Sequence, residues 1–129
     1  DELPSPESSD GLSDNEGAGD PLDRAAIEDL RELGGQEMFS ELARTFIDDA
    51  GSNLAALRKS VEEGDASSVE LIAHTLVGSS GNMGASRMAS ICSQIESGAS
   101  EEPTAALLER LEAEFERVRS ALNTEIEAG

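Results

Sequence analysis

Apolar residues recur every three or four positions from about residue 21 onward, and this spacing predicts α-helices. No segment of useful length alternates apolar and polar residues as a half-buried strand does. Four long runs follow one another and place these side chains toward a common core: Phe39, Leu42, Phe46, Ala50, Leu54, Leu57 and Val61; Val69, Ile72, Leu76 and Met83; Met88, Ile91, Cys92 and Ile95; Leu107, Leu111, Phe115, Val118, Leu122 and Ile126.

Glycine, aspartate and proline mark the ends of these runs. A short leading helix with Ala26, Ile27, Leu30 and Leu33 is capped by Asp20 or Asp23. The expected breaks lie at Gly34-Gly35, Gly64-Asp65, Gly84-Ala85 and the loop 98–102, which precedes Pro103 at the first turn of the last helix. Short loops between amphipathic helices predict an all-α fold, an antiparallel four-helix bundle with a short additional N-terminal helix.

The first 20 residues differ from the rest, because they contain seven acidic residues, no basic one and few large apolar side chains. Such a segment cannot bury enough surface to offset its chain entropy. We therefore predict a disordered acidic linker or tail over residues 1–20 and one domain over residues 21–127. The chain begins with Asp1 rather than Met, as expected of a fragment of a longer protein.

Charge and composition narrow the function classes. A net charge of −19 disfavours nucleic acid and anionic membrane surfaces, which both require clustered Lys and Arg. There is no apolar run of membrane-spanning length and no signal-peptide pattern, so we expect a cytoplasmic domain without membrane contact. Cys92 is the single cysteine and lies in an apolar helical pattern, which predicts a buried, inert thiol in a reducing compartment.

His74 is the only histidine, and Gly78 follows it by one helical turn. Glycine inside a helix costs about 1 kcal/mol relative to alanine, so its presence suggests a purpose. Residues at i and i+4 share a helix face, so Gly78 leaves one flank of the imidazole bare. Leu71 and Val77 lie on the same side, away from the core stripe, and would form an apolar docking surface around the ring.

Other chemistry of a lone histidine finds little support. A zinc site needs three or four suitable ligands, and one His and one Cys on different faces do not supply them. The segment Gly78-Ser79-Ser80-Gly81 lacks the spacing of a hydrolase nucleophile elbow and follows no strand. A phosphate-binding P-loop requires a Gly-Lys pair, whereas Lys59 is the only lysine.

The segment from His74 to Ser80, with Gly84-Ala85, Met88, Cys92 and Ile95-Glu96, closely resembles the histidine-containing phosphotransfer (HPt) domain. The core motif of that family is His-x-Leu-Lys-Gly-Ser-Ser followed by Leu-Gly-Ala. Matching positions extend over residues 21–126. The motif is specific as a combination, although each piece alone is weak.

The resemblance implies a helical bundle that carries phosphate on His74 and relays it between aspartates of response-regulator receiver domains. It implies no ATP site and no cofactor of its own, because the receiver supplies its aspartate and bound Mg²⁺. Such a domain is a phosphoryl carrier rather than an enzyme, expected to be monomeric, and its parent chain can be a hybrid histidine kinase. Ser79 and Ser80 would hold the helix end or hydrogen-bond near the histidine, or simply pack as small residues.

Two positions depart from the family pattern. Val77 stands where the family usually has Lys near the phosphoryl oxygens, and Arg87 or a partner residue is the candidate substitute. Glu96 stands where a Gln is often found, and its carboxylate would either repel the phosphate or orient the imidazole N–H. Two further hypotheses stay open: a degenerate HPt-like adaptor that binds receivers without carrying phosphate, and a plain helical interaction module.

Overall fold

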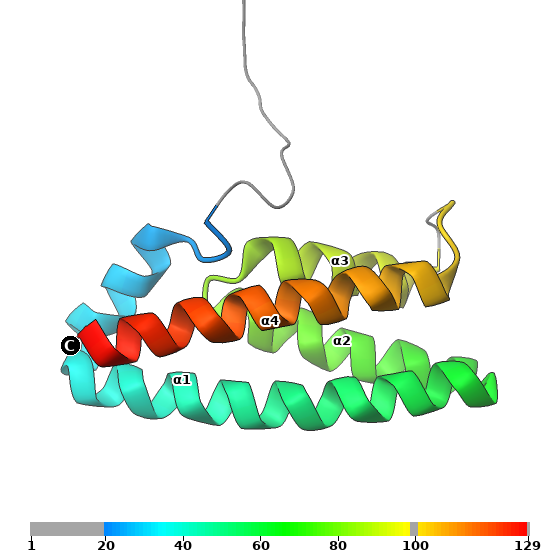
Figure 1. The fold of residues 1–129 in the computed structure, drawn as a ribbon, viewed down its shortest axis with the longest axis horizontal. Helices are drawn as coiled ribbons and strands as arrows, with labels where there is room; N and C mark the ends of the chain where they lie inside the picture. Colours follow the sequence, from blue (N-terminus) through cyan, green and yellow to red (C-terminus); the bar gives the residue numbers. More distant parts are fainter. Residues whose placement is uncertain (1–19, 99–100, 129) are drawn as a thin grey trace, which may run out of the picture.

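The computed structural model of the chain describes residues 20–98 and 101–128, and within them it contains four α-helices and no strand (Figure 1). The helices are α1 (Arg24–Glu63), α2 (Ala66–Asn82), α3 (Ser86–Ser97) and α4 (Thr104–Ala128). Each helix packs on the next one in the sequence, and α4 closes the bundle against α1. The predicted four-helix bundle is confirmed; the predicted disorder of residues 1–20 lies, except for residue 20, outside the described residues.

The expected leading helix is the first part of α1, which is kinked at Gly35. Gly35 has φ 83° and ψ 179°, outside the helical region, whereas the residues on both sides are helical. The predicted break is therefore real, but it is one residue wide, and the chain resumes its helix without a loop. A residue with positive φ at this point favours glycine. The kink turns the first part of α1 across the end of the bundle (Figure 1).

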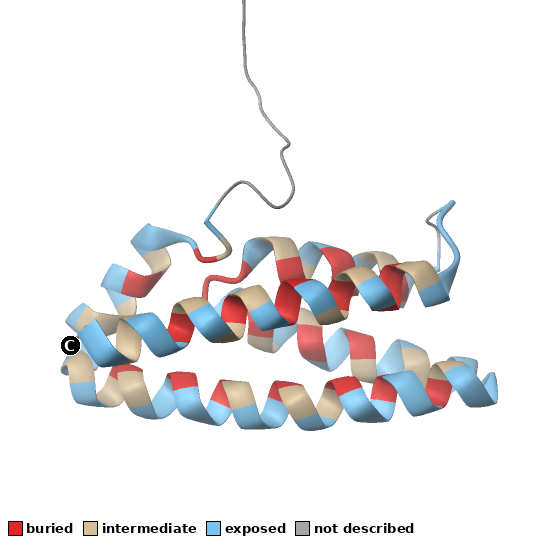
Figure 2. Cartoon of the chain, in the orientation of Figure 1, coloured by how far each residue is buried: buried red, intermediate tan, exposed pale blue. Residues whose placement is uncertain are grey.

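The core is mainly aliphatic and includes all three phenylalanines, and buried residues lie on all four helices (Figure 2). The Phe46 and Phe115 rings join α1 to α4, with centroids 6.5 Å apart and planes tilted by 58°, an arrangement that aromatic pairs favour. Cys92 is fully buried, and this burial raises the pKa of its thiol to about 12. A thiol in that environment is unreactive at neutral pH, as the sequence predicted.

Leu42, assigned to the core from the sequence, lies at the surface, as does Leu33, an apolar position of the predicted leading helix. Leu33, two residues before the kink at Gly35, is 78% exposed. Leu42 is 41% exposed, because the buried stripe of α1 passes through Ala43, which is fully covered. A small residue in contact with a neighbouring helix is easily overlooked when apolar positions are chosen by size.

The turn between α1 and α2 has the predicted chemistry. Gly64 ends α1 in the left-handed conformation, with φ 72°, and its backbone N–H bonds to carbonyls of the last turn. Asp65 caps α2: its carboxylate accepts from the Ser68 N–H at 3.2 Å and from the Ser68 hydroxyl at 2.8 Å. These hydrogen bonds lower the pKa of Asp65. The cap fixes where α2 begins and thus the rotation of its faces.

The connection from α2 to α3 is held by the start of α1. Gly84 has φ 76°, and its carbonyl accepts a hydrogen bond of 2.7 Å from the Asp23 N–H. A Cβ at Gly84 would lie 2.9 Å from the Ala26 Cβ, a distance that no normal contact allows. Glycine is required here for both its conformation and its size. Asp23, one of two candidate caps, is the residue that caps α1, through a 3.0 Å bond from the Ala25 N–H.

A cluster of ion pairs fastens the kinked end of α1 to the last turns of α4. Arg24 and Arg31 donate to the Glu125 carboxylate at 2.7 Å and 2.9 Å, and that side chain is only 14% exposed. The Arg31 guanidinium also lies over the Phe39 ring, 4.9 Å from its centroid. Hydrogen bonding from Arg24, opposed by burial and reinforced by Arg31, lowers the pKa of Glu125 to about 2.

Candidate functional site: an exposed histidine on the α2–α3 face

His74 lies in the middle of α2, on the side that faces away from the core. Its neighbours Ala73 and Leu76 are fully buried, whereas the His74 side chain is 70% exposed. The imidazole is therefore accessible to a second molecule along much of its surface. The sequence prediction that His74 points away from the inner stripe is confirmed.

One ring nitrogen of His74 is bonded to the neighbouring helix. Nδ1 lies 2.7 Å from Oε2 of Glu96 on α3. An ionised carboxylate can only accept, so Nδ1 carries the proton and donates it to Glu96. In the neutral ring the other nitrogen, Nε2, then has a free lone pair. Of the two effects proposed for Glu96 from the sequence, this geometry matches the orientation of the imidazole N–H.

The surface beside the imidazole is open and partly apolar. Gly78 is exposed, and a Cβ built on it would meet no atom within 4 Å. The fold itself therefore has no steric need for glycine at this position. Leu71 is 67% exposed, and Val77 is half-buried against the core. These residues leave a shallow apolar surface next to His74, as expected of a docking site.

The two serines of the motif stabilise the end of α2 through their backbone. The Ser80 carbonyl accepts from Ala85 N–H at 2.9 Å, and the Ser79 carbonyl accepts from Met83 N–H at 3.3 Å. Ser80 is fully buried, and the Ser79 hydroxyl donates to the Leu76 carbonyl at 3.4 Å. Of the roles predicted from the sequence, these contacts match holding the helix end, and the burial of Ser80 also matches packing as a small residue.

Arg87, the cation considered as a substitute for the missing lysine, faces another helix. Its Nη1 lies 3.8 Å from Oε1 of Glu114 on α4, and Arg117 donates to the same oxygen at 3.0 Å. Glu114 is only 4% exposed. Removing either partner of a buried ion pair is costly, which ties Arg87 to α4. The geometry therefore does not support a role for Arg87 at His74.

The sequence did not single out Glu114. It follows Leu111 by three positions and precedes Phe115, so it falls on the apolar stripe of α4. An acidic residue on such a stripe is the signal that could have identified it, because a buried carboxylate needs a partner.

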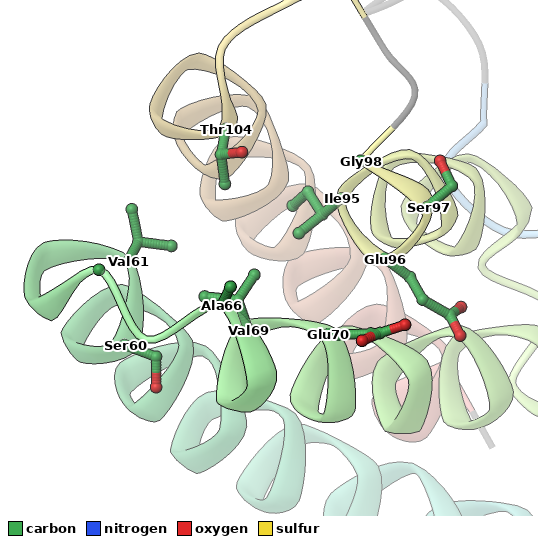
Figure 3. A pocket seen from close by; sticks show the side chains of 11 residues that line it. Ser60, Val61, Ala66, Val69, Glu70, Ile95, Glu96, Ser97, Gly98 and Thr104 are labelled. Carbon is green, nitrogen blue, oxygen red and sulfur yellow. The ribbon is translucent and has the colours of Figure 1, made fainter.

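A pocket of about 410 Å³ opens between the α1–α2 turn, the end of α3 and the start of α4 (Figure 3). Its apolar wall includes Val61, Val69 and Ile95. Glu96, the hydrogen-bond partner of His74, lines it from α3, and Glu70, one helical turn before His74, lines it from α2. This pocket is not apparent in the sequence, because its walls come from all four helices.

The helix that carries His74 has no positively charged side chain of its own. None of the nine Lys and Arg residues lies within Ala66–Asn82, the helix that carries the histidine.

In residues 20–98 and 101–128 no group of three His, Cys, Asp or Glu side chains is arranged to hold a metal ion. No helix in the same ranges is long and apolar enough to cross a bilayer.

Comparison with known proteins agrees with this arrangement. The model of the Hpt domain family matches residues 41–121. The fold is similar to the crystal structure of histidine-containing phosphotransfer protein B from Pseudomonas aeruginosa PAO1, with a TM-score of 0.78 and 31% sequence identity; the match covers 84% of this chain and 96% of that one. A search among curated proteins found no match.

The chain belongs to the Hpt domain family. Its class is therefore that of histidine phosphotransfer domains, the phosphoryl carriers of two-component phosphorelays. The resemblance seen in the sequence is confirmed at this level.

Proposed function

We propose that His74 accepts a phosphoryl group from the aspartyl phosphate of one receiver domain and passes it to the aspartate of another. The observation that carries this proposal is the His74–Glu96 pair: an exposed imidazole whose Nδ1–H is occupied by a carboxylate at 2.7 Å. That bond directs the unprotonated Nε2 outward as a nucleophile. The membership of the chain in the Hpt family supports the same role.

In the proposed step the Nε2 lone pair attacks phosphorus in line with the bond to the aspartyl oxygen. The N–P bond forms as the P–O bond breaks, and the electron pair leaves with the receiver carboxylate. Nδ1 keeps its proton throughout, so no base is needed to activate the ring. Phosphoryl transfer then depends on positioning and charge compensation more than on covalent work by the protein.

The ring acquires positive charge in this step, because both of its nitrogens are then substituted. The Glu96 carboxylate is in direct contact with Nδ1 and stabilises that charge. A glutamine at this position would fix the ring orientation without supplying the opposite charge. We infer that Glu96 favours the phosphorylated ring although it repels the phosphoryl oxygens at longer distance.

The receiver would dock over the surface formed by Leu71, Val77 and Gly78. Its aspartate must come within bonding distance of Nε2, and Gly78 leaves the space for its loops. Mg²⁺ bound by the receiver would compensate the charge of the transferred group, so the proposed role requires neither ATP nor a metal on this chain. We expect the domain to act as a cytoplasmic monomer, either free-standing or as part of a hybrid histidine kinase.

Incubation with phosphorylated receivers from a purified panel tests this proposal. The wild-type chain should gain acid-labile, alkali-stable phosphate, and His74→Gln should gain none. Because His74 is exposed, the variant should keep the helical content of the wild type in circular dichroism. Equal labelling of the two proteins would disprove the assignment of His74.

A second candidate, an adaptor that binds receivers without carrying phosphate, is favoured by one observation: no Lys or Arg lies on α2. The same experiment separates the two functions. Binding of a receiver without labelling of His74 would support the adaptor. Neither binding nor labelling by any receiver would support a plain interaction module.

A further inference from the structure

The pocket lined by Glu96, the hydrogen-bond partner of His74, has the features of a docking site for one side chain. Its volume is about 410 Å³, and its apolar wall is formed by Val61 and Val69 on one side and Ile95 on the other. The Glu70 and Glu96 carboxyl groups extend toward the same edge of it (Figure 3). A side chain that enters the pocket would therefore contact an apolar interior and two carboxyl groups at the rim.

The rim charges lack nearby cations from α2 and α3. Across Ala66–Ser97 the only basic residue is Arg87, which faces Glu114 on α4. Glu70 has no ion-pair partner among the residues that the structure describes, whereas Glu96 contacts His74 through one oxygen. Two carboxylates on an apolar pocket attract a cation more strongly than either does alone.

We propose that this pocket accepts a basic side chain, lysine or arginine, from the receiver domain that docks on His74. The aliphatic stem of such a residue would pack on Val69 and Ile95 while its charged end reaches Glu70 and Glu96. Long basic side chains bury their stems and keep their charged ends near solvent in this way. This inference rests on the proposed function, because it identifies a feature of the same partner.

The position of the pocket gives that cation a second effect. Glu96 joins the pocket rim to the imidazole, so a cation bound there lies close to the site where the phosphoryl group arrives. The family pattern places a lysine three residues after the histidine, and this chain has Val77 there. A partner cation would replace in the complex a charge that the isolated domain does not have. Selectivity for receivers with a basic residue at this contact would follow.

The test uses the receiver that labels His74 fastest in the panel described above. Its dissociation constant is measured by calorimetry with Mg²⁺ and without a phosphate donor, at low and high salt. We expect Glu70→Gln to weaken binding about threefold and Glu70→Lys to weaken it about tenfold. The dissociation constant of the Glu70→Gln variant should depend less on salt than that of the wild type. Glu41→Gln removes an equally exposed carboxylate about 30 Å away along α1 and should not change binding.

A second variant tests whether receiver binding requires the space inside the pocket. Ala66 is exposed and lines the pocket from the first turn of α2, where leucine is readily accepted. Ala66→Leu should fill part of the space and weaken receiver binding while the rim charges remain. Replacing the basic residue of the receiver by methionine should reduce its affinity for the wild type and leave its affinity for Glu70→Gln nearly unchanged.

The outcomes distinguish this inference from the proposed function. If His74 is labelled but Glu70→Lys and Ala66→Leu both bind the receiver as tightly as the wild type, the pocket is not a docking site. If Ala66→Leu binds the receiver weakly but Glu70→Lys binds it as the wild type does, the side chain in the pocket is apolar and the assignment of a basic side chain is wrong. If no receiver labels His74, the proposed function fails first, and this inference falls with it.

Discussion

Two glutamates illustrate how the molecule separates stability from reactivity. Glu125, near the end of α4, receives two guanidinium groups from the kinked part of α1 and is mostly buried. Glu96, near the end of α3, contacts a single imidazole that is itself 70% exposed. Both are carboxylates that join two helices. Only the second leaves its partner with a nitrogen that has a free lone pair.

The difference shows where positive charge is used. The arginines of the chain lie on α1, α3 and α4, and several are engaged in ion pairs between helices, such as Arg58 with Glu112 and Arg24 with Glu125. The face around His74 has no such pair on α2. The Glu125 carboxylate is paired within the fold, whereas the face around His74 has no Lys or Arg from its own helix. Substitutions at four positions test this contrast.

The largest effect is expected from Gly78→Gln. A side chain at this position should obstruct the receiver and slow phosphoryl transfer about 100-fold, because small displacements of reacting groups are that costly. Glutamine is a better helix former than glycine, so the fold should be at least as stable. The rate is measured with a phosphorylated receiver, and Gly51→Gln on α1 is the control, since its Cβ also meets no atom within 4 Å. Equal rates for the two variants would remove the access argument.

Glu96 variants come next. Glu96→Ala removes both the orienting bond and the charge and should slow labelling of His74 about tenfold, in line with a hydrogen bond to a charged group. Glu96→Gln keeps an acceptor for Nδ1–H and should slow the labelling of His74 about threefold. Rapid-mixing assays with excess phosphorylated receiver give both rates. A glutamine variant as slow as the alanine variant would show that charge matters and orientation does not.

Substitution at the other carboxylate should change stability and leave transfer intact. The folded-state pKa of Glu125 is about 2, below its ordinary value near 4.5. The stability that its ionised carboxylate gives to the fold is therefore complete above about pH 4.5 and is lost as the pH falls toward 2. After allowance for solvent screening, Glu125→Gln should lower the free energy of unfolding at pH 7 by about 1 to 2 kcal/mol.

Urea unfolding at several pH values measures this effect. The difference between the wild type and Glu125→Gln should shrink steadily below pH 5. The exposed Glu127 offers the matched control, and Glu127→Gln should change stability by less than about 0.5 kcal/mol. A difference that stays constant down to pH 2 would show that the Glu125 charge is not its source.

The smallest effect is expected from Val77→Lys, which introduces on α2 the cation that this face lacks. Its ammonium group should reach the phosphoryl oxygens and prolong the life of phosphohistidine about twofold to fivefold, the range of an exposed ion pair. The decay of labelled protein after removal of the receiver measures it. An unchanged lifetime would mean that position 77 is not electrostatically coupled to the phosphate.

The helices, their order and the exposed histidine could all be predicted from the amino-acid sequence. Apolar spacing is a local property, and so are the caps: Asp65 and Gly64 act on residues within one turn. The direction of His74 followed from its register against Ala73 and Leu76. The same reasoning missed the exposure of Leu33 and Leu42, because burial depends on which neighbour covers a position.

Contacts between side chains of different helices could not be predicted, because they follow from how the helices pack. Glu96 is 22 residues from His74, and only the packing of α3 on α2 brings it to Nδ1 and turns a possible repulsion into an orienting bond. Packing likewise turns Arg87 toward Glu114 on α4 and assembles the pocket from four helices. Helical periodicity fixes the face on which a residue lies. The distance between two faces depends on the whole bundle, because it is set by side chains that are remote in the sequence.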